Sequence, residues 1–155
     1  MNNSATRVLV VDDERFFREA ISEALESAGI ESVKVSNGEQ ALKAVGDHGI
    51  GVVVLDIGLA GMSGIEVLER MRVLRPLLRV IVLSGASDQE SVLEALRLDA
   101  CDYLAKPLHD EELVLVVRRA MAGYGVEARG DNLRQRLWAL RAEMAALADS
   151  IRSGE

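Results

Sequence analysis

Apolar residues along the first 122 positions follow two different spacings, and these spacings alternate along the chain. Residues 7–11 form a short β-branched run, whereas residues 17–28 repeat apolar side chains every three or four positions until Gly29. A short continuous run predicts a buried strand, and a period of three to four predicts an amphipathic helix that a glycine can end. The chain therefore begins with a strand followed by a helix.

The same alternation continues through four further units. The later strands are predicted at residues 32–36, 51–55, 79–83 and 102–105. Three of the helices open at Asn37, Ser63 and Ser87, each followed three residues later by glutamine or glutamate, which is the pattern of a helix-capping box. The last helix is predicted at about residues 110–122. Five strand–helix units in one short domain predict an α/β fold, a doubly wound parallel sheet with helices on both faces.

Glycines break this pattern after residue 122. The sequence predicts a domain at residues 1–122, a linker at residues 123–131 and an amphipathic helix at residues 132–152. The apolar residues of that helix are spaced alternately by four and three, which is the a/d pattern of a coiled coil: Leu133, Leu137, Leu140, Met144, Leu147 and Ile151.

The coiled-coil stripe covers fewer than three heptads, which leaves two arrangements open. Packing of the helix back onto its own domain competes with self-association, because isolated helices of this length are only marginally stable. We favour a homodimer formed through this helix. Arg136 and Arg141 would oppose each other in a parallel pair, which favours an antiparallel or higher-order one.

The composition narrows the class of protein. Hydrophobic residues make up 49% of the chain but aromatic residues only 3%, so we expect a core of aliphatic side chains. The net charge of −7 argues against direct binding of nucleic acid, which needs clustered lysine and arginine. A single cysteine excludes an internal disulfide, and the first six residues do not resemble a secretion signal, so we expect a cytoplasmic protein. The apolar runs are too short to cross a membrane.

Polar residues stand at the ends of the predicted strands. Asp12 and Asp13 end the first strand, Asp56 the third and Ser84 the fourth, and Lys106 follows the fifth. In an open parallel sheet the carboxyl ends of the strands lie at one edge, where ligands bind. Each residue alone has a simpler explanation, as a helix cap, a solvated loop residue or a surface charge. Together, three carboxylates repel one another unless a cation lies between them, so we expect Mg²⁺, with Mn²⁺ as the alternative ion, and a bound anion.

Four motifs resemble the receiver domains of two-component response regulators, in that family's order and over roughly residues 5 to 122. They are Val-Val-Asp12-Asp13-Glu, Leu55-Asp56-Ile with Met62-Ser-Gly64, Leu83-Ser84-Gly85-Ala86, and Asp102-Tyr103-Leu-Ala-Lys106-Pro107. The resemblance implies a flavodoxin-like sheet of five strands in the order 2-1-3-4-5.

The resemblance also implies a phosphoryl-transfer site. Asp56 would be phosphorylated by a sensor histidine kinase or a histidine phosphotransfer protein. Asp13, Asp56 and the backbone carbonyl of Gly58 would bind Mg²⁺ directly, and Asp12 would bind it through water. Phosphoryl transfer depends more on positioning and charge neutralisation than on acid or base catalysis, and this residue set suits that need.

Further residues would stabilise the phosphoryl group and transmit its presence. Lys106 and Ser84 would contact the phosphoryl oxygens, and Tyr103 would turn inward when Ser84 moves, although an ordinary aromatic at a strand end is the simpler explanation of Tyr103. A cis peptide is implied between Lys106 and Pro107, as X-Pro energetics permit. Phe17 stands where receivers of this family contact the kinase, and a role in the core explains it equally well.

Two departures from the family pattern carry expectations about structure. Asp99 stands where the family commonly has glycine, and aspartate tolerates the left-handed backbone better than most residues. Residues 114–117 make the last helix of the domain unusually apolar, so they form either an extra buried face or an exposed patch that binds a partner.

Other functions fit these residues less well than that of a receiver. A phosphatase with an aspartyl nucleophile expects a second aspartate two residues after the nucleophile, where this chain has Gly58. A receiver-like module that binds partners without being phosphorylated is the other alternative. Dinucleotide binding is excluded because no Gly-x-Gly-x-x-Gly follows the first strand. We therefore expect a signalling protein and not an enzyme, in which residues 132–152 could equally lead to an output domain of a longer protein.

Overall fold

The computed structural model describes residues 6–85, 89–123, 144 and 147. The chain divides into two compact units, Met1–Tyr124 and Gly125–Glu155, and the fold described below is that of the first. Its strands are β1 (Arg7–Val11), β2 (Ser32–Val35), β3 (Ile50–Asp56), β4 (Arg79–Ser84) and β5 (Asp102–Ala105). Its helices are α1 (Arg15–Ser27), α2 (Gly38–Ala44), α3 (Gly64–Leu74), α4 (Gln89–Arg97) and α5 (Asp110–Gly123).

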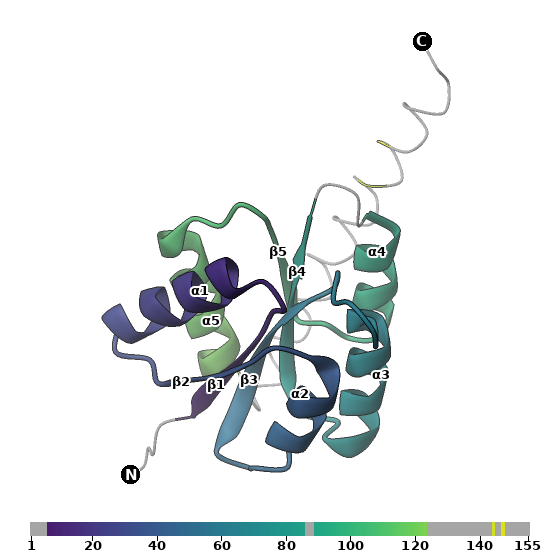
Figure 1. Cartoon of the computed structure of the whole chain (residues 1–155), viewed down its shortest axis with the longest axis horizontal. Coiled ribbons are helices and arrows are strands. Elements are labelled where there is room, and N and C mark those ends of the chain that lie inside the picture. The colour runs from purple at the N-terminus through teal and green to yellow at the C-terminus, as the bar shows by residue number, and fades with distance from the viewer. Residues whose placement is uncertain (1–5, 86–88, 124–143, 145–146, 148–155) are drawn as a thin grey trace. The chain divides into compact units, whose positions relative to one another are not determined.

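The five strands form one parallel sheet in the order β2-β1-β3-β4-β5. Helices α1 and α5 cover one face, and α2, α3 and α4 cover the other (Figure 1). Every residue of the central strand β3 is buried, because both faces of the sheet are covered there. The predicted doubly wound, flavodoxin-like α/β fold is therefore confirmed.

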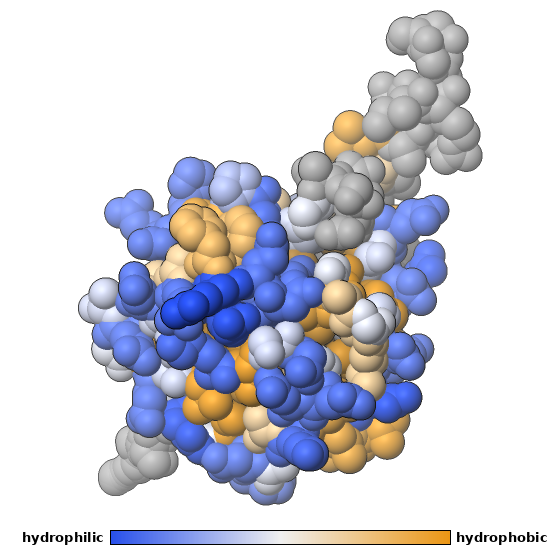
Figure 2. Space-filling model, viewed as in Figure 1, coloured by the Kyte–Doolittle hydropathy of each residue, from blue (hydrophilic) through white to orange (hydrophobic). Residues whose placement is uncertain are grey.

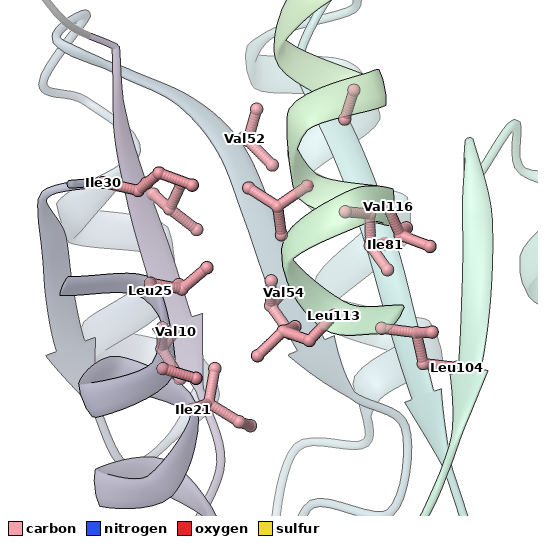
Figure 3. Close-up of a cluster of buried hydrophobic side chains, with 14 of the residues drawn as sticks. Val10, Ile21, Leu25, Ile30, Val52, Val54, Ile81, Leu104, Leu113 and Val116 are labelled. Atoms are coloured by element: carbon pink, nitrogen blue, oxygen red, sulfur yellow. The ribbon is translucent and has the colours of Figure 1, made fainter. Parts of the chain in front are cut away.

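The core between the sheet and the pair α1 and α5 is aliphatic, as the scarcity of aromatic residues predicts. Val10 and Val54 of the sheet face Leu25 of α1 and Leu113 of α5 (Figure 3). Leu25 and Leu113 are almost wholly buried, and truncating such a leucine to alanine costs about 2–5 kcal/mol. This packing gives the strand ends a rigid support.

Side-chain caps fix the starts of two helices on the opposite face. Asn37 Oδ1 accepts the backbone N–H of Gln40 at 2.8 Å before α2, and Ser63 Oγ accepts that of Glu66 at 3.2 Å before α3. The caps predicted at these positions are confirmed, and the one predicted at Ser87 lies outside the described residues.

Asp99 adopts the backbone conformation that the family's glycine would require. Its φ is 65°, in the left-handed region, at the turn between α4 and β5. The expectation that aspartate keeps this turn is confirmed, since its short polar side chain tolerates the region better than most.

The apolar stretch of α5 divides between the two expected roles. Val116 and Val117 are buried in the core, whereas Val114 is only partly buried and Leu115 is 51% exposed. A partner surface that includes Val116 or Val117 is therefore wrong, because both are covered within the chain, and only the outer side of this stretch remains available.

The predicted linker and coiled-coil helix lie outside the described residues, except for Met144 and Leu147, which are helical. On the first unit, Val73, Leu74 and Leu77 expose hydrophobic side chains at and after the end of α3. Figure 2 shows hydrophobic surface at its lower right, where α3 ends in Figure 1. Within the part of the chain that the structure describes, no helix has the length and hydropathy needed to span a bilayer.

Candidate functional site

Three aspartates meet at the carboxyl edge of the sheet. Because β1 and β3 pair in parallel with Val11 beside Leu55, the residues that end these strands come together. Asp12, Asp13 and Asp56 each offer a carboxylate oxygen, and these oxygens lie within 4.8 Å of one another. Asp12 and Asp56 are buried, and Asp13 is exposed. The structure thus brings together residues that end two strands far apart in the sequence.

A backbone N–H group holds each of these carboxylates in place. The Glu14 N–H donates to Asp12 Oδ1 at 2.9 Å, and the Gly58 N–H donates to Asp56 Oδ1 at the same distance. The Ala60 N–H donates to Asp13 Oδ2 at 3.0 Å. Each contact engages one oxygen of its carboxylate, and the second oxygens of Asp12 and Asp56 lie near the Lys106 ammonium.

Gly64 allows the loop after β3 to lie against the start of α3. A Cβ atom at this position would lie 2.5 Å from both the carbonyl oxygen of Asp56 and the Cα of Ile57. Such a separation is shorter than any stable contact, so only glycine fits without moving the backbone that carries Asp56. Gly64 belongs to the motif that follows Asp56 in the sequence, and its local role is this close approach.

Lys106 supplies the positive charge of the site. Its Nζ lies 3.0 Å from Asp12 Oδ2 and 3.3 Å from both Asp56 Oδ2 and Glu14 Oε1, and its side chain is 12% exposed. The backbone N–H of Lys106 donates to the carbonyl of Ser84 at 2.8 Å, and the peptide bond between Lys106 and Pro107 is cis. The backbone of Lys106 is therefore fixed by a hydrogen bond to Ser84, and its ammonium contacts Asp12, Asp56 and Glu14.

The charges of the cluster shift the pKa values of its members. Burial raises the pKa of Asp12 above its ordinary value, the N–H of Glu14 and the ammonium of Lys106 lower it, and the charge of Asp56 raises it again. The net direction is upward. Burial alone would lower the pKa of Lys106, but the close Asp12 carboxylate and the charge of Asp56 outweigh burial and raise it. Lys106 carries one positive charge, which does not balance the carboxylates of Asp12, Glu14 and Asp56 that lie within 3.3 Å of it.

The residues fit a divalent cation. Asp12 Oδ2 is buried and, within the described part of the chain, accepts no hydrogen bond of good geometry, although Lys106 lies near it. Hard carboxylate oxygens with spare acceptor capacity are the ligands that Mg²⁺ prefers, and it usually keeps several waters. The cluster has the donor set and the excess negative charge for such an ion.

Ser84 and Tyr103 lie beside the cluster. Ser84 is buried at the end of β4, one residue beyond Leu83, which pairs with Asp56. Tyr103 is partly buried on β5, opposite Val82. Within residues 6–85 and 89–123, no hydrogen bond joins the Ser84 hydroxyl or the Tyr103 ring to the three aspartates, so their predicted roles remain predictions.

Two neighbours of Lys106 were not predicted as parts of this site. The Phe17 ring lies beneath the ammonium, with Nζ 4.3 Å from the ring centroid, and Glu14 pairs with the same atom. Phe16 is 77% exposed and meets the edge of Phe17 at a centroid distance of 5.4 Å. The acid directly after the aspartate pair was visible in the sequence, but its pairing with a lysine 92 residues away was not.

The amino-acid sequence matches a known family model. The model described as "Response regulator receiver domain" matches residues 8–118. A "Putative response regulator NtrX-like" from Rickettsia bellii is 36% identical over 115 residues, which are 73% of this chain and 24% of that relative. The "DNA-binding transcriptional regulator NtrC" of Escherichia coli is 32% identical over 127 residues, which are 82% of this chain and 27% of that one.

A solved structure agrees with these sequence matches. The receiver domain of NtrX from Brucella abortus superposes with a TM-score of 0.71 at 33% identity, covering 74% of this chain and 98% of that one. The chain spans about a quarter of the length of the curated relatives it matches. The similarity therefore concerns one region of those longer proteins.

Proposed function

Because this chain belongs to the response regulator receiver domain family, we propose that Asp56 accepts a phosphoryl group from a sensor histidine kinase or a histidine phosphotransfer protein. One observation carries the proposal. The buried Asp56 carboxylate lies among the Asp12 and Asp13 carboxylates, with the Lys106 ammonium 3.3 Å from its Oδ2. A nucleophile, a cation-binding pair and a fixed positive charge are what phosphoryl transfer needs.

The proposed transfer assigns a role to each residue. An Asp56 carboxylate oxygen attacks phosphorus, an aspartyl phosphate forms, and the bond between phosphorus and the donor histidine nitrogen breaks. Asp13, Asp56 and the Gly58 carbonyl would bind Mg²⁺ directly and Asp12 through water. When bound, the ion neutralises charge on the phosphoryl oxygens. Lys106 would pair with another of these oxygens.

Ser84 and Tyr103 would convert the chemical change into a structural one. Ser84 would donate its hydroxyl to a phosphoryl oxygen and shift toward Asp56. Tyr103, which is partly buried on the neighbouring strand, would then turn inward. This gives the receiver two states that differ on the surface formed by β5, and the phosphoryl group would select between them.

The partners follow from the same assignment. Phe17 lies at the start of α1 beside an apolar groove of about 250 Å³ that Ile21, Pro107 and Leu108 help to line, which supports a contact with the kinase there.

Residues 1–122 would be the receiver, and residues 123–131 would lead to a helix at residues 132–152 that pairs with a second copy. The relatives are longer, so a downstream output domain is part of the proposal. We expect the protein to act in the cytoplasm.

The test is phosphorylation by a small donor. Acetyl phosphate with Mg²⁺ should add one phosphoryl mass to the intact chain, and the gain should vanish in Asp56→Asn and in the presence of a chelator. Asp110→Asn, which removes an exposed aspartate at the start of α5, is the matched control and should phosphorylate normally. A gain that persists in Asp56→Asn would overturn the assignment of the acceptor, and no gain in the wild type would favour the unphosphorylated binding module.

A further inference from the structure

We propose that Phe17 positions the Lys106 ammonium against Asp56, and that it does so in competition with Glu14. The inference rests on the proposed function, because it concerns how the site accepts a phosphoryl group.

The Lys106 ammonium has alternative carboxylate partners inside the site and at its rim. Its Nζ lies at the same distance, 3.3 Å, from Asp56 Oδ2 inside the site and from Glu14 Oε1 at the rim. The side chain of Asp56 is 6% exposed, whereas that of Glu14 is 61% exposed. When the Lys106 ammonium pairs with Glu14, it moves toward solvent and away from Asp56, where the phosphoryl group would be attached.

The Phe17 ring opposes that movement. Its centroid lies 4.3 Å from Nζ, within the range in which an ammonium is attracted to the face of an aromatic ring. Phe17 is itself held in place, because it packs against the core that α1 shares with α5 and meets Phe16 edge to face at 82°. A fixed ring beside a flexible lysine restricts where the ammonium can lie.

Restricting the Lys106 ammonium matters because phosphoryl transfer is faster when the stabilising positive charge is already in position. A pre-oriented ammonium stabilises developing charge on the phosphoryl oxygens without first having to be ordered. Without the ring, Lys106 spends more time with Glu14 and in water. Phe17 is a positioning residue in this scheme, since it acts on the phosphoryl group only through Lys106.

The decisive experiment measures phosphorylation rates with acetyl phosphate and Mg²⁺, because a small donor needs no protein docking surface. Phe17→Leu should be roughly three- to tenfold slower than the wild type, the size expected for a partly buried cation–π contact. Phe17→Tyr keeps the ring face and should stay within about twofold of wild type. Val73→Ala, which shortens a side chain that is 82% exposed near the end of α3, should also stay within about twofold of wild type.

A second variant separates positioning from a merely structural role. Adding Glu14→Gln to Phe17→Leu removes the competing partner and should recover most of the lost rate, as a double-mutant cycle will show. Loss of packing alone predicts no recovery. Melting temperatures of all variants, measured with a chelator, establish that each is folded.

Each outcome decides the proposal. Slowed phosphorylation in Phe17→Leu with recovery by Glu14→Gln supports it. A wild-type rate in Phe17→Leu, with transfer from a kinase still impaired, overturns it and leaves Phe17 as a docking residue. Slowing without recovery also overturns it. Failure of the proposed function itself is distinct, because the wild type would then show no Mg²⁺-dependent phosphorylation at all.

Discussion

Two aspartates at opposite ends of β1 show how differently one fold can treat the same side chain. Asp12 follows the last residue of the strand, is buried, and has a raised pKa because burial disfavours its charge. Asp47 pairs with Arg7, the first residue of the strand, and has a lowered pKa because the Gly49 N–H and the Arg7 guanidinium stabilise its charge. One carboxylate opposes folding at neutral pH, and the other supports it.

The arginines extend this contrast to the whole sheet. At the amino end, Arg75 donates to three backbone carbonyls in and before β3, Arg72 to two carbonyls before β4, and Arg79 to the last residue of α5. These guanidinium groups are used in holding loops and helix ends. At the carboxyl end, Arg18 donates to the Asp12 carbonyl, and among the described residues Lys106 is the one cation that pairs with an aspartate of the cluster, whose carboxylates keep acceptor capacity for a ligand. Stability is concentrated at one edge, and the capacity to bind is concentrated at the other.

The largest expected effect comes from removing Arg75. Arg75→Met leaves the carbonyls of Val45 and Ile50 without their donor and should lower the free energy of unfolding by about 3 kcal/mol, the upper range for a charged hydrogen-bonding group. Denaturant unfolding will measure the loss, and phosphorylation of the folded protein should be unchanged.

Arg70→Met provides the matched control for Arg75. Its exposed ion pair with Glu66 spans 3.5 Å on one helix face and should contribute no more than about 0.5 kcal/mol. Equal losses in the two variants would mean that the amino edge is not specifically stabilised by Arg75.

A smaller effect of opposite sign is expected at Asp12. In the presence of a chelator, Asp12→Asn should raise the free energy of unfolding at pH 7, by less than the loss expected for Arg75→Met, because it removes a buried charge beside Asp56. The variant should also be stabilised less by added Mg²⁺ than the wild type. A variant less stable than wild type without metal would contradict this account of the carboxyl edge.

The pH dependence of the Asp12 effect follows from the raised pKa. A carboxyl whose pKa is higher in the folded state is protonated first in that state as the pH falls. The wild type therefore gains stability relative to Asp12→Asn between the folded pKa and the ordinary value of 3.8, and its deficit should disappear below that window. Unfolding curves at several pH values, with chelator, will measure this.

The smallest effect is expected at Asp47, which is exposed. Its pKa is lower in the folded state, so it adds stability above the ordinary value of 3.8 that is lost as the pH falls through the folded pKa. Asp47→Asn should be slightly less stable than wild type at pH 7, and the two should converge in acid. Parallel curves for the two proteins at every pH would show that the Arg7 and Gly49 contacts contribute nothing.

The amino-acid sequence by itself determined the order of the strands and helices and which residues end each strand. These features depend on local spacing, since strand and helix periods, capping residues and turns are properties of neighbours along the chain. The gathering of Asp12, Asp13 and Asp56 was predictable for the same reason, because parallel strands bring their carboxyl ends to one edge. The left-handed turn at Asp99 was predicted from the resemblance to the receiver family, which commonly has glycine at this position.

Only the tertiary structure decided what each of these residues touches. The Phe17 ring under Lys106, the pairing of Lys106 with Glu14 and the donation from Arg75 to Ile50 join residues 25 to 92 positions apart. The burial of Val116 beside an exposed Leu115 likewise depends on how α5 is rotated on the sheet. Such contacts depend on packing angles and rotamers that no local pattern encodes, because they form only when separate elements meet across the core.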